Sequence, residues 1–339
     1  AAMRDGHTRY VSPQGLPALR EAIVRHARGR GLSVAAGDVV VGSGVKPLLV
    51  SVLLALVQHG DEVLLPDPGY PGYAAATALA GADVRHYPVA TRSGSNELDL
   101  DALEATITPA TRVLVLNSPH NPTGAVLDNH ALIRIAEVAE RHDLWIVSDE
   151  IYAPLTYDGV VPASIAAVAG MRRRTIVLDG LSKSHAMTGW RLGWAIAPAP
   201  VAAAITRIIG DSSTCTPAFV QHAGVAALTG PQDLSDVMRS AYRSRRDALV
   251  FALRAIDGVG VGAPAGALYA FADVRAVMHR TRAAYSADVA NVLLRECGVA
   301  CVDGAVFGAR GEGHLRFSFA LPADALDDAL QRLAVWGRR

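Results

Sequence analysis

The sequence predicts an α/β protein, with a large domain built on a mostly parallel sheet and a smaller α+β domain at the C-terminal end. Short apolar runs alternate with helix-like periodic segments over the first half of the chain. Strands that alternate with helices are typical of a parallel sheet with helices on both faces. After about residue 232 one long helical segment precedes isolated strands. We therefore expect a large domain at residues 1–232, and a joining helix and small domain at 233–339.

The elements of the large domain follow one another in a regular order. A first helix begins at Pro17 and ends near Gly29 and Gly31, because proline is favoured in the first turn of a helix and glycine just past its end. Apolar runs then predict strands at 39–41, 62–65, 84–87, 112–116, 144–147 and 175–178. Helical periodicity covers 48–58, 73–79 and 131–141.

The small domain and the N-terminal end are predicted from weaker patterns. Residues 1–5 have no helix cap and read as the tail of a helix whose beginning lies outside this sequence. The small domain is expected to contain a helix at 234–255, a strand at 266–271, a helix at 287–295, a strand at 315–319 and a closing helix.

Composition limits the classes of function. Of 339 residues, 51% are hydrophobic and 19% charged, and the formal net charge is zero, which favours a globular protein over one that binds nucleic acid or an anionic membrane. No apolar run reaches the roughly 20 residues of a membrane-spanning helix. Cys215, Cys297 and Cys301 include no CxxC pair, and the histidines have no metal-ligand spacing. We therefore expect a cytoplasmic protein without disulfides or a metal.

The functional interpretation depends on Lys183. It lies in a glycine-rich segment, 180–193, directly after the buried strand at 175–178, and strand ends are where α/β proteins place their chemistry. Most lysines are solvated surface charges, but Lys183 and Lys46 are the only lysines in the chain. Lysine, unlike arginine, can lose its proton when buried and attack a carbonyl to form an imine. Imine chemistry is therefore an option.

The segment 180–193, GLSKSHAMTGWRLG, resembles the lysine signature of class I and II aminotransferases, which are pyridoxal-phosphate enzymes of fold type I. The resemblance implies a mostly parallel seven-stranded sheet between helices, with a smaller C-terminal domain. It also implies that Lys183 binds pyridoxal 5'-phosphate through an imine and that Arg191 contacts its phosphate. Gly180 departs from the pattern, because relatives often have a phosphate-binding serine there, and Ser182 is the residue that can compensate.

A second glycine-containing loop, VGSGVKP at 41–47, ends a strand and opens a helix. The amide groups and dipole of a helix start favour an anion. The loop lacks the spacing of a Walker A loop and the third glycine of a dinucleotide site, and Ser43 lacks the partner motifs of β-lactamase-like enzymes. In the resembled family the loop's backbone binds the phosphate, which points to Gly44, Val45 and Lys46. In some relatives a lysine here meets the distal carboxylate of an acidic substrate, so the resemblance suggests aspartate or glutamate as a substrate of this chain.

Polar residues follow three other predicted strands. Tyr70, in DPGYPGY, can stack on a flat ring or pack on its own loop, and the resemblance favours stacking. Asn121 lies in NSPHNPTG, which resembles the family's N-P-x-N-P-T-G motif. That match implies that its amide donates to the phenolic oxygen of the cofactor, beside the substrate.

Asp149 and Tyr152 follow the apolar strand at 144–147. A carboxylate there can keep the ring nitrogen of the cofactor protonated, which lets the ring store electrons, and Tyr152 can bind the phenolic oxygen beside Asn121. Glu150 is interpreted as a supporting charge. The carboxyl ends of parallel strands share one edge of a sheet. We therefore expect one rim to carry Gly44, Tyr70, Asn121, Asp149 and Lys183.

Arg316 and Tyr10 complete the predicted site. Arg316 lies in an alternating apolar strand, where an unpaired charge is costly. The family places its arginine for the substrate α-carboxylate there, and an internal ion pair is the alternative. Tyr10 opens the run 10–20, which resembles the family's Y-x-x-x-x-G-x-x-x-L-R segment. That match implies a homodimer in which Tyr10 reaches the phosphate of the neighbouring subunit, whereas a turn tyrosine that packs locally is the alternative. In the family a further N-terminal segment helps to cover the active site.

Together these residues predict a transaminase that moves an amino group between an L-amino acid and a 2-oxo acid. In the predicted reaction the substrate amine displaces Lys183, whose free amine then moves a proton between the substrate α-carbon and C4′ of the cofactor. Relatives with the same cofactor residues carry out eliminations, cyclisations or oxidations. A biosynthetic lyase, cyclase or oxidase is therefore the alternative, and a non-catalytic ligand-binding relative is a third interpretation, against which the complete set of cofactor residues weighs.

Overall fold

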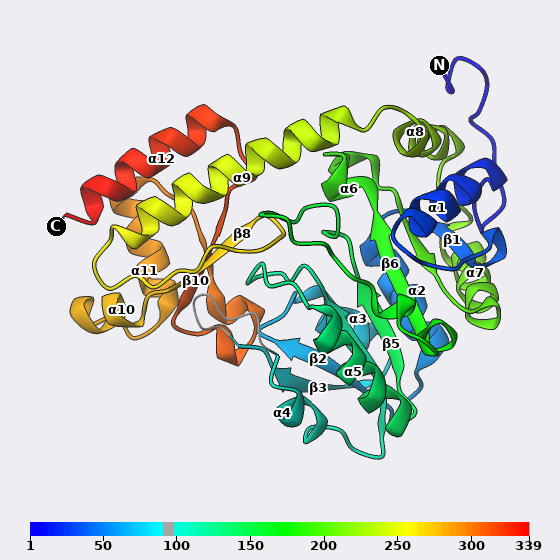
Figure 1. The fold of residues 1–339 in the computed structure, drawn as a ribbon, viewed down its shortest axis with the longest axis horizontal. Coiled ribbons are helices and arrows are strands. Elements are labelled where there is room, and N and C mark those ends of the chain that lie inside the picture. The colour runs from blue at the N-terminus through cyan, green and yellow to red at the C-terminus, as the bar shows by residue number, and fades with distance from the viewer. Residues whose placement is uncertain (91–97, 339) are drawn as a thin grey trace.

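The large sheet determines where the polar strand ends meet. The computed structural model describes residues 1–90 and 98–338. Within these residues the sheet has seven strands in the order β1-β7-β6-β5-β4-β2-β3, and Figure 1 labels β1, β2, β3, β5 and β6. Their bounds are β1 (Val39–Gly42), β2 (Glu62–Asp67), β3 (Asp83–Pro88), β4 (Thr111–Asn117), β5 (Trp145–Asp149), β6 (Thr175–Gly180) and β7 (Gly193–Ile196). The predicted α/β fold with a seven-stranded, mostly parallel sheet is confirmed.

One strand of the sheet runs against the others. β7 pairs antiparallel with both β6 and β1, whereas the remaining neighbours pair in parallel. Six strands therefore end at one edge, and β7 begins there. The sequence did not predict β7, because only the one-turn helix α6 (Leu181–Ser184) and a short 3-10 turn separate it from β6, and so short a segment shows no helical periodicity.

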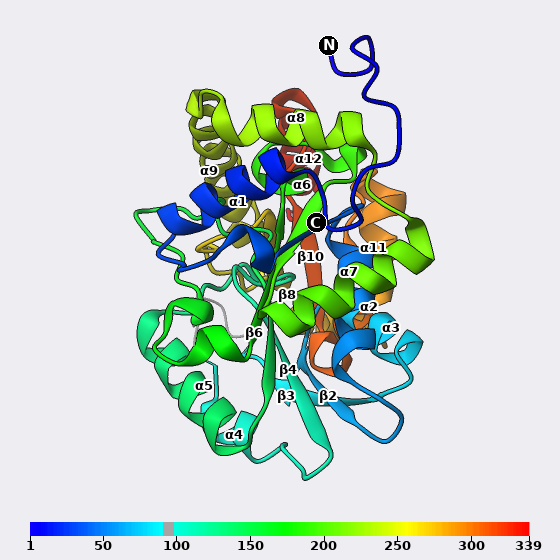
Figure 2. The same cartoon turned by 90° about the vertical axis from the view of Figure 1, so that its right-hand side faces the viewer.

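Helices cover both faces of the sheet, as the edge-on view in Figure 2 shows. One face packs against α2 (Val45–Leu56), α3 (Gly72–Leu79) and α7 (Ala199–Ser213). The other packs against α1 (Pro17–Gly29), α4 (Leu100–Glu104), α5 (Asn129–Arg141) and α8 (Ala218–Thr229). Central strand residues such as Val113 and Ile146 have no exposed surface, which explains the apolar runs from which the strands were predicted.

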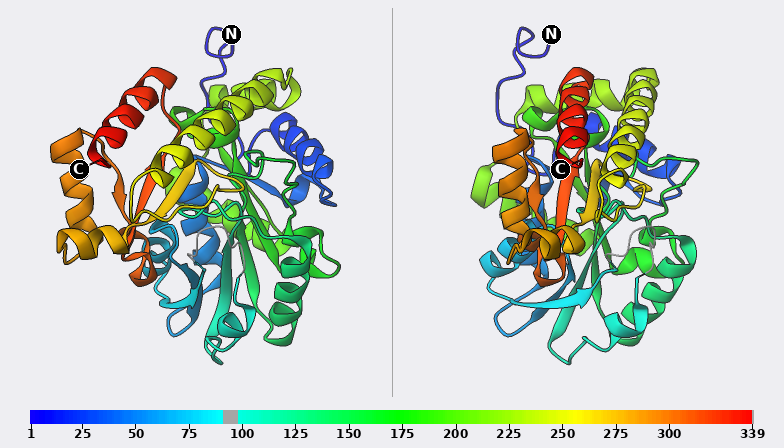
Figure 3. Two further views of the ribbon diagram at one scale, coloured as in Figure 1. Left: turned by 60° about the vertical axis from the view of Figure 1, so that its left-hand side comes forward. Right: turned by 90° about the vertical axis from the view of Figure 1, so that its left-hand side faces the viewer.

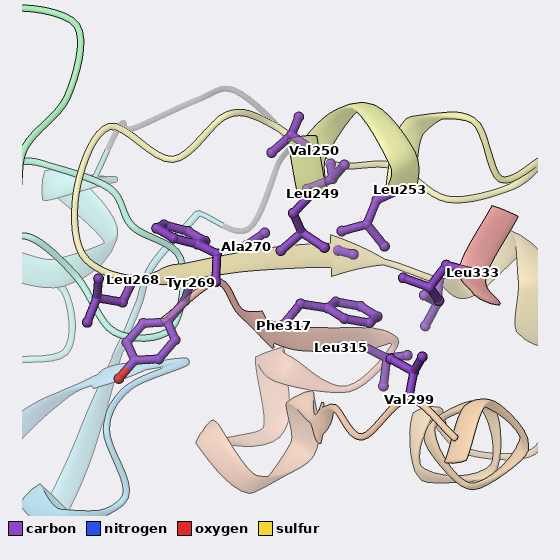
Figure 4. Packing of buried hydrophobic residues seen from close by; sticks show 14 of the residues in the cluster. Leu249, Val250, Leu253, Leu268, Tyr269, Ala270, Val299, Leu315, Phe317 and Leu333 are labelled. Atoms are coloured by element: carbon purple, nitrogen blue, oxygen red, sulfur yellow. The ribbon is translucent and has the colours of Figure 1, made fainter. Parts of the chain in front are cut away.

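The second sheet lies beside the first and has the order β8-β10-β9, with antiparallel pairing. Its strands are β8 (Tyr269–Asp273), β9 (Val302–Asp303) and β10 (His314–Ser318), and its helices are α9 (Asp233–Arg254), α10 (Arg275–Thr281), α11 (Ser286–Val292) and α12 (Ala323–Trp336). Figure 3 shows α9 and α12 beside this sheet. Residues of β8, β10, α9 and α12 share one buried cluster (Figure 4). We propose 233 as the domain boundary, because α9 begins there.

Several predicted bounds in this region are corrected. The strand expected at 266–271 is β8, at Tyr269–Asp273. Its predicted first residues instead pair with the large domain: the Gly266 N–H donates to the Gly124 carbonyl at 2.9 Å, and the Ala267 N–H donates to the Leu155 carbonyl at 2.9 Å. The helix expected at 287–295 is α11, which continues as a π-helical turn at Leu293–Cys297. α10 and β9 were not predicted.

The N-terminal prediction is also corrected. Residues 2–6 form turns rather than the tail of a helix. The Asp5 N–H donates to the Ala1 carbonyl, but Gly6 follows in a left-handed conformation with φ 84°, which ends the turn. Among the helices of the described residues, none is long and apolar enough to cross a membrane.

Candidate active site

A cavity of about 370 Å³ lies at the edge where six strands of the large sheet end. All predicted site residues except Gly44 and Tyr10 line it. Lys46, Lys183, Arg191 and Arg316 are the cationic side chains of the lining, and Asp149 is its carboxylate. This excess of positive charge suits a ligand with anionic groups.

One corner of the cavity is built for an anion. Gly44 has φ 95° and precedes α2, whose first amide groups have no partner within the helix. Arg191 precedes β7, and because β7 runs antiparallel, its start lies at the edge where β1 ends. The two residues touch: a Cβ on Gly44 would lie 2.5 Å from Arg191 Nη2. The positive φ favours glycine at this position. Gly44 thus belongs to this corner although it does not line the cavity.

Lys183 lies on the short helix α6 (Leu181–Ser184), directly after β6. It is partly buried, and its Nζ lies 5.9 Å from the ring centre of Tyr152. Tyr152 is buried, and its hydroxyl lies 2.7 Å from the hydroxyl of Tyr269. Burial, followed by the neighbouring Tyr269, raises the pKa of Tyr152 well above its usual value. The Tyr152 hydroxyl therefore stays protonated and can donate.

Asp149, the last residue of β5, is the carboxylate of the site. It is 6% exposed and accepts hydrogen bonds from the Tyr73 hydroxyl at 2.8 Å and the Ile151 N–H at 3.2 Å. Burial raises the pKa of Asp149 to about 6, partly offset by these two hydrogen bonds. Within the described residues it has no ion-pair partner, so the site contains a buried carboxylate that a bound cation would stabilise.

Two asparagines shape the loop after β4. The Asn117 side chain donates to the Asp149 carbonyl at 3.0 Å and accepts from the Asn121 N–H at 2.8 Å. The Asn121 side-chain oxygen in turn accepts from Arg316 Nη1 at 2.8 Å. Because its oxygen is engaged in this way, the amide nitrogen of Asn121 remains to face a ligand.

Arg316, on β10, is brought to the site by the small domain. Its guanidinium carbon lies 4.2 Å from the ring centre of Tyr269 and 4.6 Å from that of Phe307. Burial lowers the pKa of Arg316. The alternative of an internal ion pair finds no support, because no carboxylate of the described residues lies within ion-pair distance of Arg316.

The remaining predicted residues lie at the margin of the cavity or outside it. Tyr70 packs edge-to-face on Tyr73, with ring centres 5.4 Å apart, and Lys46 Nζ lies 5.7 Å from the ring centre of Tyr70. Ser182 lines the cavity beside Lys183. Tyr10 is 84% exposed and is not part of this cavity.

Comparison with known proteins identifies the family. Residues 1–333 match the family described as aminotransferase class I and II. The chain belongs to this family. It is 38% identical over 333 residues to the arginine–pyruvate transaminase AruH of Pseudomonas aeruginosa, covering 97% of this chain and 82% of that protein. An aspartate aminotransferase of Bacillus sp. (strain YM-2) is 36% identical, with 98% of this chain and 84% of that protein covered.

The solved structures agree with this assignment. The aromatic aminotransferase of Pyrococcus horikoshii superposes with a TM-score of 0.94 at 34% identity, and the match covers 99% of this chain and 90% of that one. This chain is therefore an aminotransferase of the pyridoxal-phosphate-dependent kind, acting between an amino acid and a 2-oxo acid. The relatives do not favour a lyase, cyclase or oxidase.

The structure adds residues of this aminotransferase that the sequence analysis left without a role. Tyr73 donates a hydrogen bond to Asp149, a contact that the sequence analysis did not predict. Asn117 and Tyr269 line the cavity and contact predicted residues. Asn117 could have been found, because it directly follows the strand predicted at 112–116 and is the last residue of the observed β4. Tyr269 gives no such signal, since it lies inside the strand predicted for the small domain.

A buried ion-pair network lies beside the strand ends of the aminotransferase site. Arg30, just past α1, binds Glu150 at 2.5 Å and Asp179 at 3.1 Å. Glu150 also accepts hydrogen bonds from Ser148 and Ser164. Both carboxylates are at most 2% exposed, and they adjoin Asp149 and the Lys183 segment in the sequence. Arg30 thereby holds together the two strand ends that carry the acid and the amine.

Proposed function

We propose that the cavity binds pyridoxal 5'-phosphate and that Lys183 is the amine that bonds to it. One observation carries this proposal: a lysine amine, a buried carboxylate and a helix start with an adjacent arginine converge on one cavity from separate strand ends. These groups match the three functional parts of the cofactor, namely its carbonyl, its ring nitrogen and its phosphate.

The phosphate is assigned to the corner formed by Gly44 and Arg191. The amide groups of Val45 and Lys46 at the start of α2 can donate to phosphate oxygens, and the helix dipole favours the negative charge. Arg191 supplies a guanidinium fork, which is suited to phosphate geometry. Ser182 offers a hydroxyl in place of the one that Gly180 lacks.

The ring is assigned to the space between Tyr70, Asp149, Asn121 and Tyr152. Asp149 would face the ring nitrogen and hold a proton on it, because a buried carboxylate is stabilised by an adjacent cation. The Asn121 amide and the Tyr152 hydroxyl would donate to the phenolic oxygen, and Tyr70 would contact the ring face. When bound, the cofactor supplies the electron sink that weakens bonds at the substrate α-carbon.

The chain's own residues bind the substrate and move one proton. As a free amine, Lys183 Nζ would take the proton from the substrate α-carbon and return it at C4′ of the cofactor, which is general acid–base catalysis by a positioned amine. Arg316 binds the α-carboxylate, and its contact with Asn121 places the carboxylate beside the cofactor.

We further propose a preference for acidic substrates through Lys46. Once Lys183, Arg191 and Arg316 are assigned, Lys46 is the cationic side chain of the cavity lining that remains. It is exposed at the margin of the cavity, 5.7 Å from the ring centre of Tyr70, so its flexible ammonium can reach a distal carboxylate.

A homodimer with shared sites is proposed from Tyr10. Its 84% exposure leaves a large amphipathic side chain in water, and a second copy of the chain would cover it. In a mixed dimer of Lys183→Ala and Tyr10→Ala chains, one site is expected to combine both changes and the other to be intact. No recovery of activity on mixing would contradict shared sites.

We also propose a cytoplasmic location, supported by the odd number of cysteines without a CxxC pair.

The proposed function is tested by absorption spectroscopy. The purified chain is mixed with pyridoxal 5'-phosphate, dialysed, and given single amino acids without a 2-oxo acid. We expect a visible band that one class of amino acid removes, with release of one equivalent of 2-oxo acid. A bound band that instead yields ammonia or consumes oxygen would contradict transamination, and the absence of a band in the dialysed protein would contradict the cofactor site.

A further inference from the structure

Tyr269 connects the two halves of the site. It begins β8 and belongs to the buried cluster of the small domain, but its side chain points away from Leu249, Leu253 and Leu333 in Figure 4. It lines the cavity instead. Its hydroxyl lies 2.7 Å from that of Tyr152, and its ring centre lies 4.2 Å from the guanidinium carbon of Arg316.

We propose that Tyr269 is a positioning residue whose hydroxyl orients the proton of Tyr152 into the cavity and whose ring holds the guanidinium of Arg316 in place. The inference rests on the proposed function, because it takes Tyr152 as a cofactor contact and Arg316 as the substrate carboxylate contact. It adds a role that depends on the small domain, since Tyr152 follows β5 and Tyr269 lies in β8.

The proposal requires that Tyr269 donates this hydrogen bond to Tyr152. Each hydroxyl has one proton to donate and can also accept, and the short contact between Tyr152 and Tyr269 uses one of the two protons. If Tyr152 donated to Tyr269, it would have no proton left for a ligand. If Tyr269 donates to Tyr152, the Tyr152 proton is free to point into the cavity. Hydrogen bonds in such a chain polarise one another, so the bond from Tyr269 strengthens Tyr152 as a donor.

The ring of Tyr269 acts on Arg316 in a different way. The guanidinium lies over the ring of Tyr269 and, at 4.6 Å, over that of Phe307, and a cation over a ring face is attracted to it. Nη1 is held by Asn121, whereas the buried Nε of Arg316 has no hydrogen-bond partner among the described residues. A planar donor group that is fixed before binding loses less freedom when a carboxylate arrives. The orphaned Nε is thus a donor left for that carboxylate.

Two substitutions separate the hydroxyl from the ring, and a third provides a control. Tyr269→Phe removes the hydroxyl alone, whereas Tyr269→Leu removes the ring as well. Tyr157→Phe is the matched control, because Tyr157 is 2% exposed, donates to the Ala267 carbonyl at 2.7 Å and lies under the guanidinium of Arg246 at 4.9 Å. Tyr157 does not line the cavity.

The first readout is the pH at which the visible band of the cofactor-loaded enzyme shifts, without substrate. Donation from Tyr152 stabilises an anionic phenolic oxygen and so favours loss of the proton from the lysine–cofactor bond. Weaker donation in Tyr269→Phe should raise the pH midpoint of this shift by about half to one pH unit. This corresponds to the free energy of one neutral hydrogen bond. The midpoint of Tyr157→Phe should equal that of the wild type.

Kinetics separate the two parts of the proposal. In Tyr269→Phe, kcat should fall about three- to tenfold while KM for the amino acid is unchanged, because the ring still contacts Arg316. In Tyr269→Leu, KM should also rise about three- to thirtyfold, the range of a partly buried cation–π contact. An unchanged KM in this variant overturns the role of the ring.

A cofactor-free readout makes the hydroxyl contact testable independently. In protein labelled with ¹³C at the ζ carbon of its nine tyrosines, the Tyr152 signal should move in Tyr269→Phe and stay in Tyr157→Phe. Three results would each overturn the role of the hydroxyl. The Tyr152 signal could stay in place in Tyr269→Phe, the pH midpoint of the visible band could be unchanged, or Tyr157→Phe could show the same effects as Tyr269→Phe. If the wild type binds pyridoxal 5'-phosphate without a visible band, the proposed function fails, and the inference fails with it.

Discussion

The buried carboxylate of Asp149 should lower the stability of the cofactor-free protein, whereas a neutral side chain at the same position should not. Burial raises the pKa of Asp149 from 3.8 to about 6. A folded-state pKa above the unfolded value means that the carboxyl stabilises the fold fully below pH 4 and loses this contribution as the pH rises through 6. A shift of about two units corresponds to about 3 kcal/mol at pH 7.5, at 1.36 kcal/mol per unit.

Asp149→Asn should therefore make the cofactor-free protein more stable at neutral pH. An amide can accept from the Ile151 N–H and donate to the Tyr73 oxygen, so both contacts of Asp149 can be kept. The gain in free energy of unfolding should be about 1 kcal/mol at pH 4.5 and about 3 kcal/mol at pH 7.5. Urea unfolding of both proteins at these two pH values measures it.

Asp179→Asn serves as the control, because Asp179 is equally buried but is paired with Arg30. It should destabilise the protein at both pH values, since it leaves Arg30 with one carboxylate instead of two. The same Asp149→Asn change should weaken binding of pyridoxal 5'-phosphate about 10²-fold or more, the cost of removing one partner of a buried charge pair. An Asp149→Asn protein that is no more stable than the wild type at pH 7.5, or whose gain is the same at pH 4.5, would refute the reasoning.

Three further substitutions test other parts of the site. Arg30→Met should destabilise the protein by about 3–5 kcal/mol, because it leaves the buried carboxylate of Glu150 without a counterion and Asp179 with only His26 beside it. An unchanged midpoint of urea unfolding would contradict this. Lys46→Ala should lower the ratio of kcat/KM for aspartate or glutamate to kcat/KM for alanine about tenfold, as measured by steady-state kinetics. An unchanged ratio would remove the support for an acidic substrate. Arg316→Lys should raise KM for every amino acid about tenfold or more, because a single ammonium cannot make the paired contact of a guanidinium with the α-carboxylate. A KM equal to that of the wild type would show that Arg316 does not bind the α-carboxylate.

The sequence predicted the parts of the fold that repeat a simple pattern. Strands buried on both faces leave apolar runs, so β4, β5 and β6 were found close to their observed bounds. The polar residues just past these strands could be predicted to meet, because parallel strands end at one edge. This is why Asn121, Asp149 and Lys183 were placed together before their contacts were known.

The parts that the sequence did not predict depend on contacts between distant segments. β7 follows β6 after only the one-turn helix α6 and a short 3-10 turn, and its antiparallel direction, which brings Arg191 to the rim, is a property of pairing and not of composition. The strand at 266–271 was placed too early, because Gly266 and Ala267 bond to the large domain. Tyr269 was missed for a related reason: a tyrosine in a strand does not show whether its hydroxyl meets the core or a cavity.

The most direct test of the account is the identity of the lysine that bonds to pyridoxal 5'-phosphate. The chain contains only Lys46 and Lys183, and both line the same cavity, so mass mapping after reduction with borohydride gives an unambiguous answer. The account predicts that the reduced cofactor is found on the peptide 175–191, which contains Lys183, and that Lys46 is unmodified. Cofactor on Lys46, or on neither lysine in protein that has a visible band, would contradict it.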